Sequence, residues 1–291
     1  MIIDFHVHLF PPEVVNNREA YLQMDPWFAL LYSNPKATLA TVEDLIAAMD
    51  EAGVDKAVVY GFSWCDAGAC NMGNDYVLDA MRRYPERLIG FANVNPTQGQ
   101  TAVREIRRCV EAGMRGIGEL MPNGQGYSLD DTDVMAPIVA AARAANIPIV
   151  THTSEPVGHD YPGKGTVTMR SIYRFALAFP EATLVLAHWG GGLPFYELMP
   201  EVRRALRNVY YDTAASMLLY DAQVFPLMYP LVGPKILFGT DYSLIHPSKF
   251  LEHIRGSGLS LEAQRAVLGE NAARLLGLSI APAQIDNRPR L

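Results

Sequence analysis

Two histidines, His6 and His8, close the first apolar stretch of the chain, MIIDFHVH. Residues two apart on a β-strand point to the same side, so both imidazoles would face the interior of the fold. Burying two imidazoles costs desolvation free energy unless something binds them. The pair therefore indicates metal ligation, although taken alone it would also fit two partly exposed loop histidines.

Four further side chains with metal-binding chemistry end other apolar stretches: Glu119 in GIGEL, His152 in VTHT, His188 in LAHWG and Asp241 in GTDY. Each alone has an ordinary structural explanation, such as a buried hydrogen-bonded histidine, a helix cap or, for Glu119, the partner in an ion pair. Together they predict a single metal site, made of His6, His8, Glu119, His152, His188 and Asp241.

The chemistry of this set is that of a catalytic metal centre. Neutral imidazole and carboxylate suit a divalent ion such as zinc, at about 2.0–2.2 Å. An ion with an open position lowers the pKa of bound water from about 15.7 to near 7, which gives hydroxide at neutral pH. We expect one or two ions per chain, zinc being the simplest choice. Asp241 can bind the metal and accept the proton of that water, and His188 is either a ligand of a second ion or a free acid–base group.

Alternating strands and helices must position these residues. The hydrophobic pattern predicts strands at residues 1–8, 55–62, 87–94, 114–120, 147–153, 183–189, 209–215 and 235–242. It predicts helices at residues 41–53, 74–84, 101–112, 134–145, 169–179, 196–206, 222–231 and 261–278. Eight such repeats favour an α/β fold of the (β/α)8 TIM-like barrel type over an open sheet. The candidate ligands then lie at the carboxyl ends of the strands, where such barrels carry their active sites.

The length of 291 residues fits one barrel domain, which we expect at residues 1–280, followed by a polar tail at 281–291. Long connections at residues 9–40, 121–133 and 154–168 follow the first, fourth and fifth strands. All three leave the strands at the end where the candidate ligands lie.

The third connection offers groups that could bind a substrate. Lys164 lies between two glycines and, with free backbone N–H groups, suits an anionic group. We expect the substrate to contact Lys164, His159, Tyr161, Arg170 and Trp64, although a polar surface loop and a core tryptophan explain these residues equally well.

The amino-acid composition limits the classes of molecule that the chain is expected to bind. The net charge is −7 and basic residues do not cluster, which argues against a nucleic-acid polymer. No stretch reaches the ~18 apolar residues of a membrane span, and the amino terminus does not resemble a signal peptide. The three cysteines match no disulfide or zinc framework, so we expect a cytoplasmic protein. A small-molecule substrate is the expected partner, and the apolar stretch 217–229 could supply a homodimer face.

The motifs DFHVH, HTSEP, AHWGGG and GTDY resemble those of the amidohydrolase superfamily. They are most similar to the amidohydrolase-related (amidohydrolase 2) branch that includes aminocarboxymuconate semialdehyde decarboxylase, and the resemblance runs from the first to the eighth strand. It implies dimers and one metal ion, with His188 as an acid–base group. The ligands that it implies are His6, His8, His152 and Asp241.

Glu119 departs from the superfamily pattern, because many members carry a carboxylated lysine at the end of the fourth strand. A glutamate there is similar to the TatD-type nucleases and related hydrolases with two metals. Glu119 would then bridge two ions, and the number of ions stays open.

We expect a metal-dependent hydrolase that activates water for attack on an amide, lactone or ester bond of a small anionic substrate. One alternative is a metal-dependent non-oxidative decarboxylase (a lyase) of an unsaturated or aromatic acid, and a second is a TatD-like phosphoesterase. A structural metal-binding protein is less consistent with ligands on a loop-rich rim, because structural sites are closed by four ligands.

Overall fold

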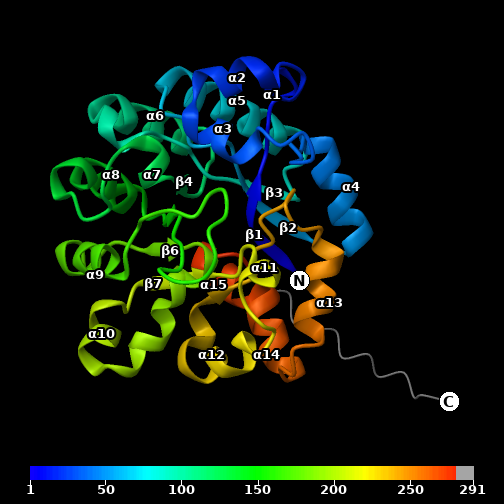
Figure 1. Cartoon of the computed structure of the whole chain (residues 1–291), viewed down its shortest axis with the longest axis vertical. Helices are drawn as coiled ribbons and strands as arrows, with labels where there is room; N and C mark the ends of the chain where they lie inside the picture. The colour runs from blue at the N-terminus through cyan, green and yellow to red at the C-terminus, as the bar shows by residue number, and fades with distance from the viewer. Residues whose placement is uncertain (280–291) are drawn as a thin grey trace.

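Eight short parallel strands lie at the centre of the computed structural model, which describes residues 1–279, and helices surround them (Figure 1). The strands are β1 (Ile3–His8), β2 (Lys56–Tyr60), β3 (Leu88–Gly90), β4 (Ile117–Leu120), β5 (Ile149–Thr151), β6 (Leu184–Leu186), β7 (Val209–Asp212) and β8 (Ile236–Leu237). Each lies within a predicted strand but is shorter: β1 and β4 start later than predicted, and the other six end before the predicted carboxyl end.

The strands close into a barrel through two backbone junctions. β1 to β3 form one run of paired strands and β4 to β8 form another. A parallel bridge between Ala92 and Ile117 joins β3 to β4, and a second between Val7 and Tyr242 joins the segment after β8 to β1. At the second junction the amide of His8 donates to the carbonyl of Tyr242 at 3.1 Å. The predicted (β/α)8 barrel is thereby confirmed.

The main helices follow the strands in the predicted order. They are α4 (Val42–Ala52), α5 (Ala67–Arg83), α6 (Gln100–Glu111), α8 (Thr132–Ala145), α9 (Met169–Ala178), α10 (Pro200–Ala205), α12 (Val224–Val232), α13 (Pro247–Arg255), α14 (Leu261–Arg265) and α15 (Asn271–Leu276). Further helical segments lie between these elements: α7 (Pro122–Gln125), α11 (Ser216–Leu219), η1 (Pro96–Gln98), η2 (His188–Leu198), η3 (Gly233–Lys235) and the π-helical η4 (Ala266–Glu270).

The predicted signals that begin and end α4 are confirmed. The Thr41 hydroxyl and the Asp44 carboxylate form a reciprocal capping box, and Gly53 ends the helix with φ of 71°. Three other predictions need correction. The predicted helix 196–206 is shorter, because η2 runs to Leu198 and α10 begins only at Pro200. α5 begins seven residues before position 74, because Asp66 caps it by accepting from the amide of Ala69. The predicted helix 261–278 is divided, because the π-helical turn η4 separates α14 from α15.

The connection at residues 9–40 folds into three helices, α1 (Pro12–Asn16), α2 (Arg18–Met24) and α3 (Pro26–Tyr32). In Figure 1 these dark blue helices gather at one end of the molecule. Asp25 fixes the start of α3, because its carboxylate accepts from the amides of Trp27 and Phe28, both at 2.9 Å. This insert has its own apolar core, which includes Phe10, Phe28 and Trp64.

Two apolar layers support the strands. Inside the barrel, Phe5, Val58, Phe91, Val150 and Leu237 fill the axis below the candidate site. A larger layer packs the outward faces of the strands against the helices. Among residues 1–279, no helix combines the length and the apolar character that crossing a membrane requires. The predicted tail, residues 281–291, lies outside the described residues.

Candidate metal centre

His6 and His8 direct their Nε2 atoms toward a common point, 3.3 Å apart. Their Nδ1 atoms are engaged on the opposite side: that of His6 lies 2.9 Å from Asp212 Oδ2, and that of His8 lies 3.2 Å from the carbonyl of Gly61. A carboxylate and a carbonyl accept hydrogen bonds, so each Nδ1 carries the proton. Each Nε2 is then the nitrogen left to bind a metal ion, which would take the place of any proton on it.

Two carboxylates approach the same point. Glu119 Oε2 lies 3.4 Å from His8 Nε2 and 3.8 Å from His6 Nε2. Asp241 Oδ1 lies 3.7 and 3.8 Å from the Nε2 atoms of His6 and His8, respectively. Ligand atoms about 2.1 Å from a tetrahedral ion are separated by about 3.4 Å. These four side chains therefore fit a divalent metal ion in donor type and in spacing.

The remaining histidines lie on the other side of Glu119. One ligand atom each from Glu119, His152 and His188 fall within 4.8 Å of one another. His152 is held at both nitrogens, with Nδ1 3.2 Å from Glu119 Oε1 and Nε2 2.9 Å from the carbonyl of Gly163. His188 Nδ1 lies 3.0 Å from the carbonyl of Ala214, which leaves its Nε2 with a lone pair. The six predicted ligands thus lie together, with Glu119 between two groups.

The carboxylates make the site favourable for positive charge. Burial disfavours protonation of His6, yet the charges of Asp212, Glu119 and Asp241 outweigh burial and raise its pKa to about 10. Burial would raise the pKa of Glu119, but His6, His152 and His8 hold it well below its usual range. Burial, together with the neighbouring His152, lowers the pKa of His188. A cation between the carboxylates is therefore electrostatically stabilised, and His188 stays neutral.

Two of the site residues have a backbone conformation that side chains other than glycine rarely adopt. His188 has φ of 53° and Asp241 has φ of 63°. Such conformations cost on the order of 1–3 kcal/mol and persist where the surrounding structure imposes them. The segment just after β8 also passes close to His6. Glycine is needed at position 239, because a Cβ there would lie 2.8 Å from the Cβ of His6.

A cavity of about 590 Å³ opens above these ligands. Its floor includes His8, Glu119, His152, His188 and Asp241. Its walls come from the α1–α3 insert and the segment that follows it, the residues after β2 and β4, the connection after β5, α11 and the segment after β8. They include Leu31, Tyr32, Lys36, Phe62, Met121, His159, Tyr161, Leu218, Leu219 and Tyr242. This size and this mixture of apolar walls and a polar floor suit a small molecule.

The structure brings only part of the predicted substrate-binding set to this cavity. His159 and Tyr161 line it. Lys164 does not, because its ammonium donates to the carbonyls of Val157, Gly158 and His159 at 2.9, 3.3 and 3.0 Å. It organises the loop instead of facing the ligands.

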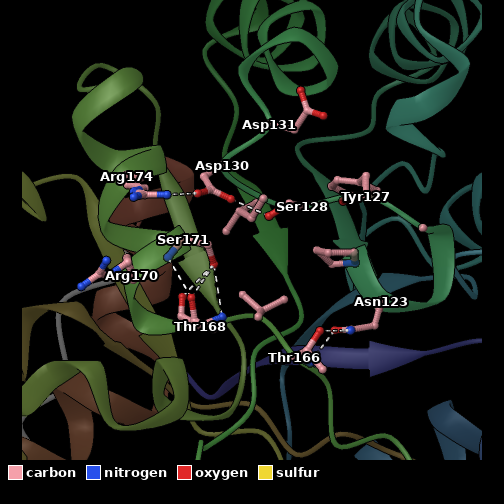
Figure 2. A pocket seen from close by; sticks show the side chains of 14 residues that line it. Asn123, Tyr127, Ser128, Asp130, Asp131, Thr166, Thr168, Arg170, Ser171 and Arg174 are labelled. Atoms are coloured by element: carbon pink, nitrogen blue, oxygen red, sulfur yellow. Dashed lines mark hydrogen bonds and ion pairs between the residues drawn. The ribbon is translucent and has the colours of Figure 1, made fainter.

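Trp64 and Arg170 also lie apart from the candidate ligands. Trp64 is 1% exposed, with its ring 4.8 Å from that of Phe28. Arg170 lines a separate cavity of about 530 Å³ between the α7–α8 region and α9 (Figure 2). There Arg174, on the same helix, pairs with Asp130 at 3.3 Å, as the figure shows.

Asp212, at the end of β7, is a site residue that the sequence reasoning missed. Its carboxylate is fully buried and accepts from His6 Nδ1 and from the amides of His188 and Ala214, at 2.9, 3.2 and 3.0 Å. It thereby orients one candidate ligand and the backbone that carries His188. The stretch VYYDT, with an aspartate ending an apolar run, is the same signal that revealed the other ligands.

Comparison with known proteins agrees with this fold. The chain matches the family described as Amidohydrolase over residues 3–278, so it belongs to this family of enzymes and the predicted resemblance is confirmed. A curated relative, the 2-amino-3-carboxymuconate-6-semialdehyde decarboxylase of Dictyostelium discoideum, is 25% identical over 243 residues. That match covers 70% of this chain and 65% of the relative, slightly less than two thirds of its length.

Solved structures show the same architecture. The 5-carboxyvanillate decarboxylase of Sphingomonas paucimobilis superposes with a TM-score of 0.77 at 19% identity, over 96% of this chain and 99% of that one. The 5-carboxyvanillate decarboxylase of Novosphingobium aromaticivorans has a TM-score of 0.78 at 20% identity, over 96% of both chains. The latter was solved with manganese and 4-hydroxy-3-methoxy-5-nitrobenzoic acid.

These comparisons correct the expected activity. The named relatives are decarboxylases, so the expectation of a hydrolase is wrong, and the decarboxylase alternative is favoured. The expectation of hydrolysis rested on Glu119 as the bridge between two ions. In the structure Glu119 Oε2 lies within 3.8 Å of the His6 and His8 ligand atoms, a spacing that a single ion can satisfy.

Proposed function

We propose that the chain is a metal-dependent, non-oxidative decarboxylase of a small aromatic or unsaturated carboxylic acid. The observation that carries the proposal is the convergence of His6, His8, Glu119 and Asp241 on one point at the floor of a cavity with apolar walls. The decarboxylase relatives support the same reaction class.

The proposed metal ligands are His6, His8, Glu119 and Asp241, with His152 beside them. A divalent ion held there would bind and orient the oxygen atoms of the substrate. Zinc remains the predicted ion, although manganese is bound in a structural neighbour and a mixed nitrogen and oxygen set accommodates either. Elemental analysis of protein purified without added metal distinguishes the two.

In the proposed reaction, a proton is added to the carbon that carries the carboxylate. The bond between that carbon and the carboxylate then breaks, its electron pair returns to the unsaturated system, and carbon dioxide leaves. Asp241 and His188 border the cavity and are the proposed proton-transfer residues. His188 Nε2 holds its lone pair toward the cavity, because Nδ1 is engaged with the carbonyl of Ala214. It would therefore first accept a proton, from water or from an acidic group of the substrate, and then deliver that proton to the carbon.

The cavity walls favour loss of the carboxylate. Leu31, Phe62, Met121, Leu218 and Leu219 replace water around the substrate. A carboxylate in such surroundings loses part of its hydration, whereas the departing carbon dioxide is neutral and needs little. The same walls provide an apolar surface for an aromatic ring or a conjugated chain.

The test is a screen of aromatic and unsaturated acids with metal-loaded protein in deuterium oxide. We expect release of carbon dioxide and a product with one deuterium at the carbon that lost the carboxylate. His188→Asn should lower the rate by about 10²-fold or more while metal content is unchanged. His253→Asn, on α13 away from the cavity, is the matched control. Fully loaded protein that releases no carbon dioxide from any acid would contradict the proposal.

A homodimer stays a prediction. The stretch 217–229 covers most of α11 and the first part of α12, where Leu218 is 58% and Leu227 is 64% exposed. Measurement of the molar mass in solution, by light scattering, tests whether this face pairs with a second copy.

A further inference from the structure

Apolar side chains line the metal-site cavity both at depth and at its opening. Phe62 and Met121 line it and are only 2% and 4% exposed, so they lie deep inside. Leu218, on α11, and Leu244, in the segment after β8, also line it but are 58% and 60% exposed. Each of these two leucines therefore borders the cavity on one side and solvent on the other.

Two further leucines complete this lining. Leu31, at the end of α3, and Leu219, at the end of α11, line the cavity and are half-buried. Leu31 lies against the loop after β5, because a Cβ at Gly163 would come within 2.7 Å of Leu31 Cδ2. Three separate parts of the chain thus contribute apolar surface to the cavity. We call these residues the leucine wall: Leu31, Leu218, Leu219 and Leu244.

The backbone of the two exposed leucines is held by the same turns that present site residues. The amide of Leu244 donates to the carbonyl of Asp241 at 2.7 Å. Leu218 lies on the short helix that follows Ala214, and the carbonyl of Ala214 lies 3.0 Å from His188 Nδ1. The exposed part of the leucine wall is therefore in a fixed position relative to the two proposed proton-transfer residues.

The cavity is larger than the proposed reaction requires. Its volume of about 590 Å³ lies in the range that holds a drug-sized molecule. Loss of a carboxylate from an unsaturated carbon involves only the few atoms next to the floor, and a single-ring acid fills a small part of the space. The remaining volume is available to a substituent of the substrate that extends from the ring toward the opening.

The chemistry of the leucine wall selects an apolar substituent. Among the described residues that line the cavity, the carboxylates are Glu119 and Asp241, and both belong to the floor. The leucine side chains offer no hydrogen bond to a polar group, whereas an apolar group that lies across them removes its own surface and theirs from water. Each methylene buried in this way tightens binding by up to about fourfold.

We propose that the leucine wall binds an apolar substituent of the substrate. The substrate is then an amphipathic acid: an aromatic or unsaturated carboxylic acid that carries an alkyl chain or a second ring. Its carboxylate end lies at the metal ligands and its substituent lies toward the opening. This inference rests on the proposed function for the position of the carboxylate end, and it names the class of acid that the site selects.

The experiment measures binding to manganese-loaded protein by calorimetry. The probes are benzoates with a methyl, propyl or pentyl chain at position 3 or at position 4. We expect the affinity in at least one series to rise by about two- to fourfold for each methylene. A 2-methoxyethoxy chain at the same position has the length of the pentyl chain but two ether oxygens, so it should bind more weakly than pentyl.

Substitutions locate the gain in the leucine wall. Leu218→Ser and Leu244→Ser should each reduce the ratio of pentyl to methyl affinity by about threefold or more, because part of the apolar surface is lost. Binding of unsubstituted benzoate should change by less than about twofold. Leu261→Ser is the matched control, since Leu261 is a 77% exposed leucine on α14 that does not line the cavity.

The proposal is overturned if affinity does not rise with chain length in either series, if the ether chain binds as tightly as pentyl, or if Leu261→Ser reduces the ratio equally. If a second copy of the chain covers these leucines instead, affinity will not rise with chain length and Leu218→Ser will lower the molar mass in solution. These affinities do not depend on turnover. A rise with chain length in protein that releases no carbon dioxide would contradict only the proposed reaction, whereas decarboxylation without such a rise would contradict only the role of the leucine wall.

Discussion

His6 Nδ1 and Asp212 Oδ2 lie 2.9 Å apart, although 206 positions separate the two residues in the sequence. This bond fixes the imidazole so that Nε2 faces the metal ligands, and it increases the basicity of that nitrogen. Carboxylates that hold a ligating histidine in this way commonly contribute about 10–100-fold to metal affinity.

Asp212→Asn should therefore weaken metal binding by about 10–100-fold while the barrel still folds. The asparagine keeps the shape of the side chain and an oxygen for the amides of His188 and Ala214, but it loses the charge. Titration against a chelator of known affinity measures the loss. Asp221→Asn, which changes an exposed aspartate, should bind metal like the wild type. Unchanged affinity in Asp212→Asn would remove Asp212 from the metal site.

Glu119 lies between two groups of ligands, which makes the number of metal ions measurable by substitution. Its Oε2 lies 3.4 Å from His8 Nε2, while its Oε1 lies 3.2 Å from His152 Nδ1. If one ion is bound, Glu119→Ala should lower its affinity by about tenfold or more because a charged ligand is lost. If two are bound, the content measured by elemental analysis should fall from two ions per chain to one or none. One ion with unchanged affinity would show that Glu119 is only an electrostatic neighbour.

The strand-end residues could be found from the sequence because each follows an apolar run. The parallel barrel brings the carboxyl ends of all its strands to one rim, so distant positions such as His6 and Asp241 had to meet. Asp212 obeys the same rule but was not predicted, because the expected strand ran on to residue 215 and placed Asp212 in its interior, whereas β7 ends at Asp212. The direction of each nitrogen could not be predicted, since it depends on carbonyls such as that of Ala214.

The substrate-facing residues were harder to predict, because they come from loops. Lys164 has the chemistry of an anion ligand, yet three loop carbonyls fall within reach of its ammonium group. Lys36 lies in a connection without a motif, and only the folding of α1–α3 brings it to the cavity. Side chains alternate between the two faces of a strand, so the face that each residue occupies can be predicted from the sequence, whereas loops have no such periodicity.

Asp4 should make the stability of the metal-free protein depend on pH. Burial raises its pKa from 3.8 to about 7, although hydrogen bonds from Thr240 and His6 oppose this. The folded protein then binds the proton more tightly than the unfolded chain does. The stabilisation is complete below pH 3.8 and is lost as the pH rises toward 7. One pKa unit corresponds to about 1.4 kcal/mol, so the loss could reach about 4 kcal/mol.

Asp4→Asn mimics the protonated carboxyl group and should lack this pH dependence. Urea unfolding in the presence of a chelator, between pH 4 and 8, gives the free energy of unfolding of both proteins. The difference between them isolates Asp4 from the other titrating groups. We expect the variant to gain stability relative to the wild type as the pH rises; parallel curves would show that Asp4 keeps an ordinary pKa in the folded protein.

Gly239 should tolerate no side chain, because the end of β8 passes close to His6. A Cβ at this position would lie 2.8 Å from the Cβ of His6, closer than real contacts allow. His6 is fully buried and held by Asp212, so it cannot move away without losing the bond that orients it. Overpacking of this kind costs about 1–3 kcal/mol in the free energy of unfolding.

Gly239→Ala should therefore lower both the stability and the metal affinity, the latter by about tenfold because the imidazole is displaced. Gly256→Ala is the control, since its Cβ would meet its nearest neighbour, the carbonyl oxygen of Glu252, at 3.4 Å. Thermal unfolding and chelator titration of the two variants separate the effects. A variant at position 239 that is destabilised but binds metal normally would mean that His6 is not displaced, and that the strain is relieved in β8 instead.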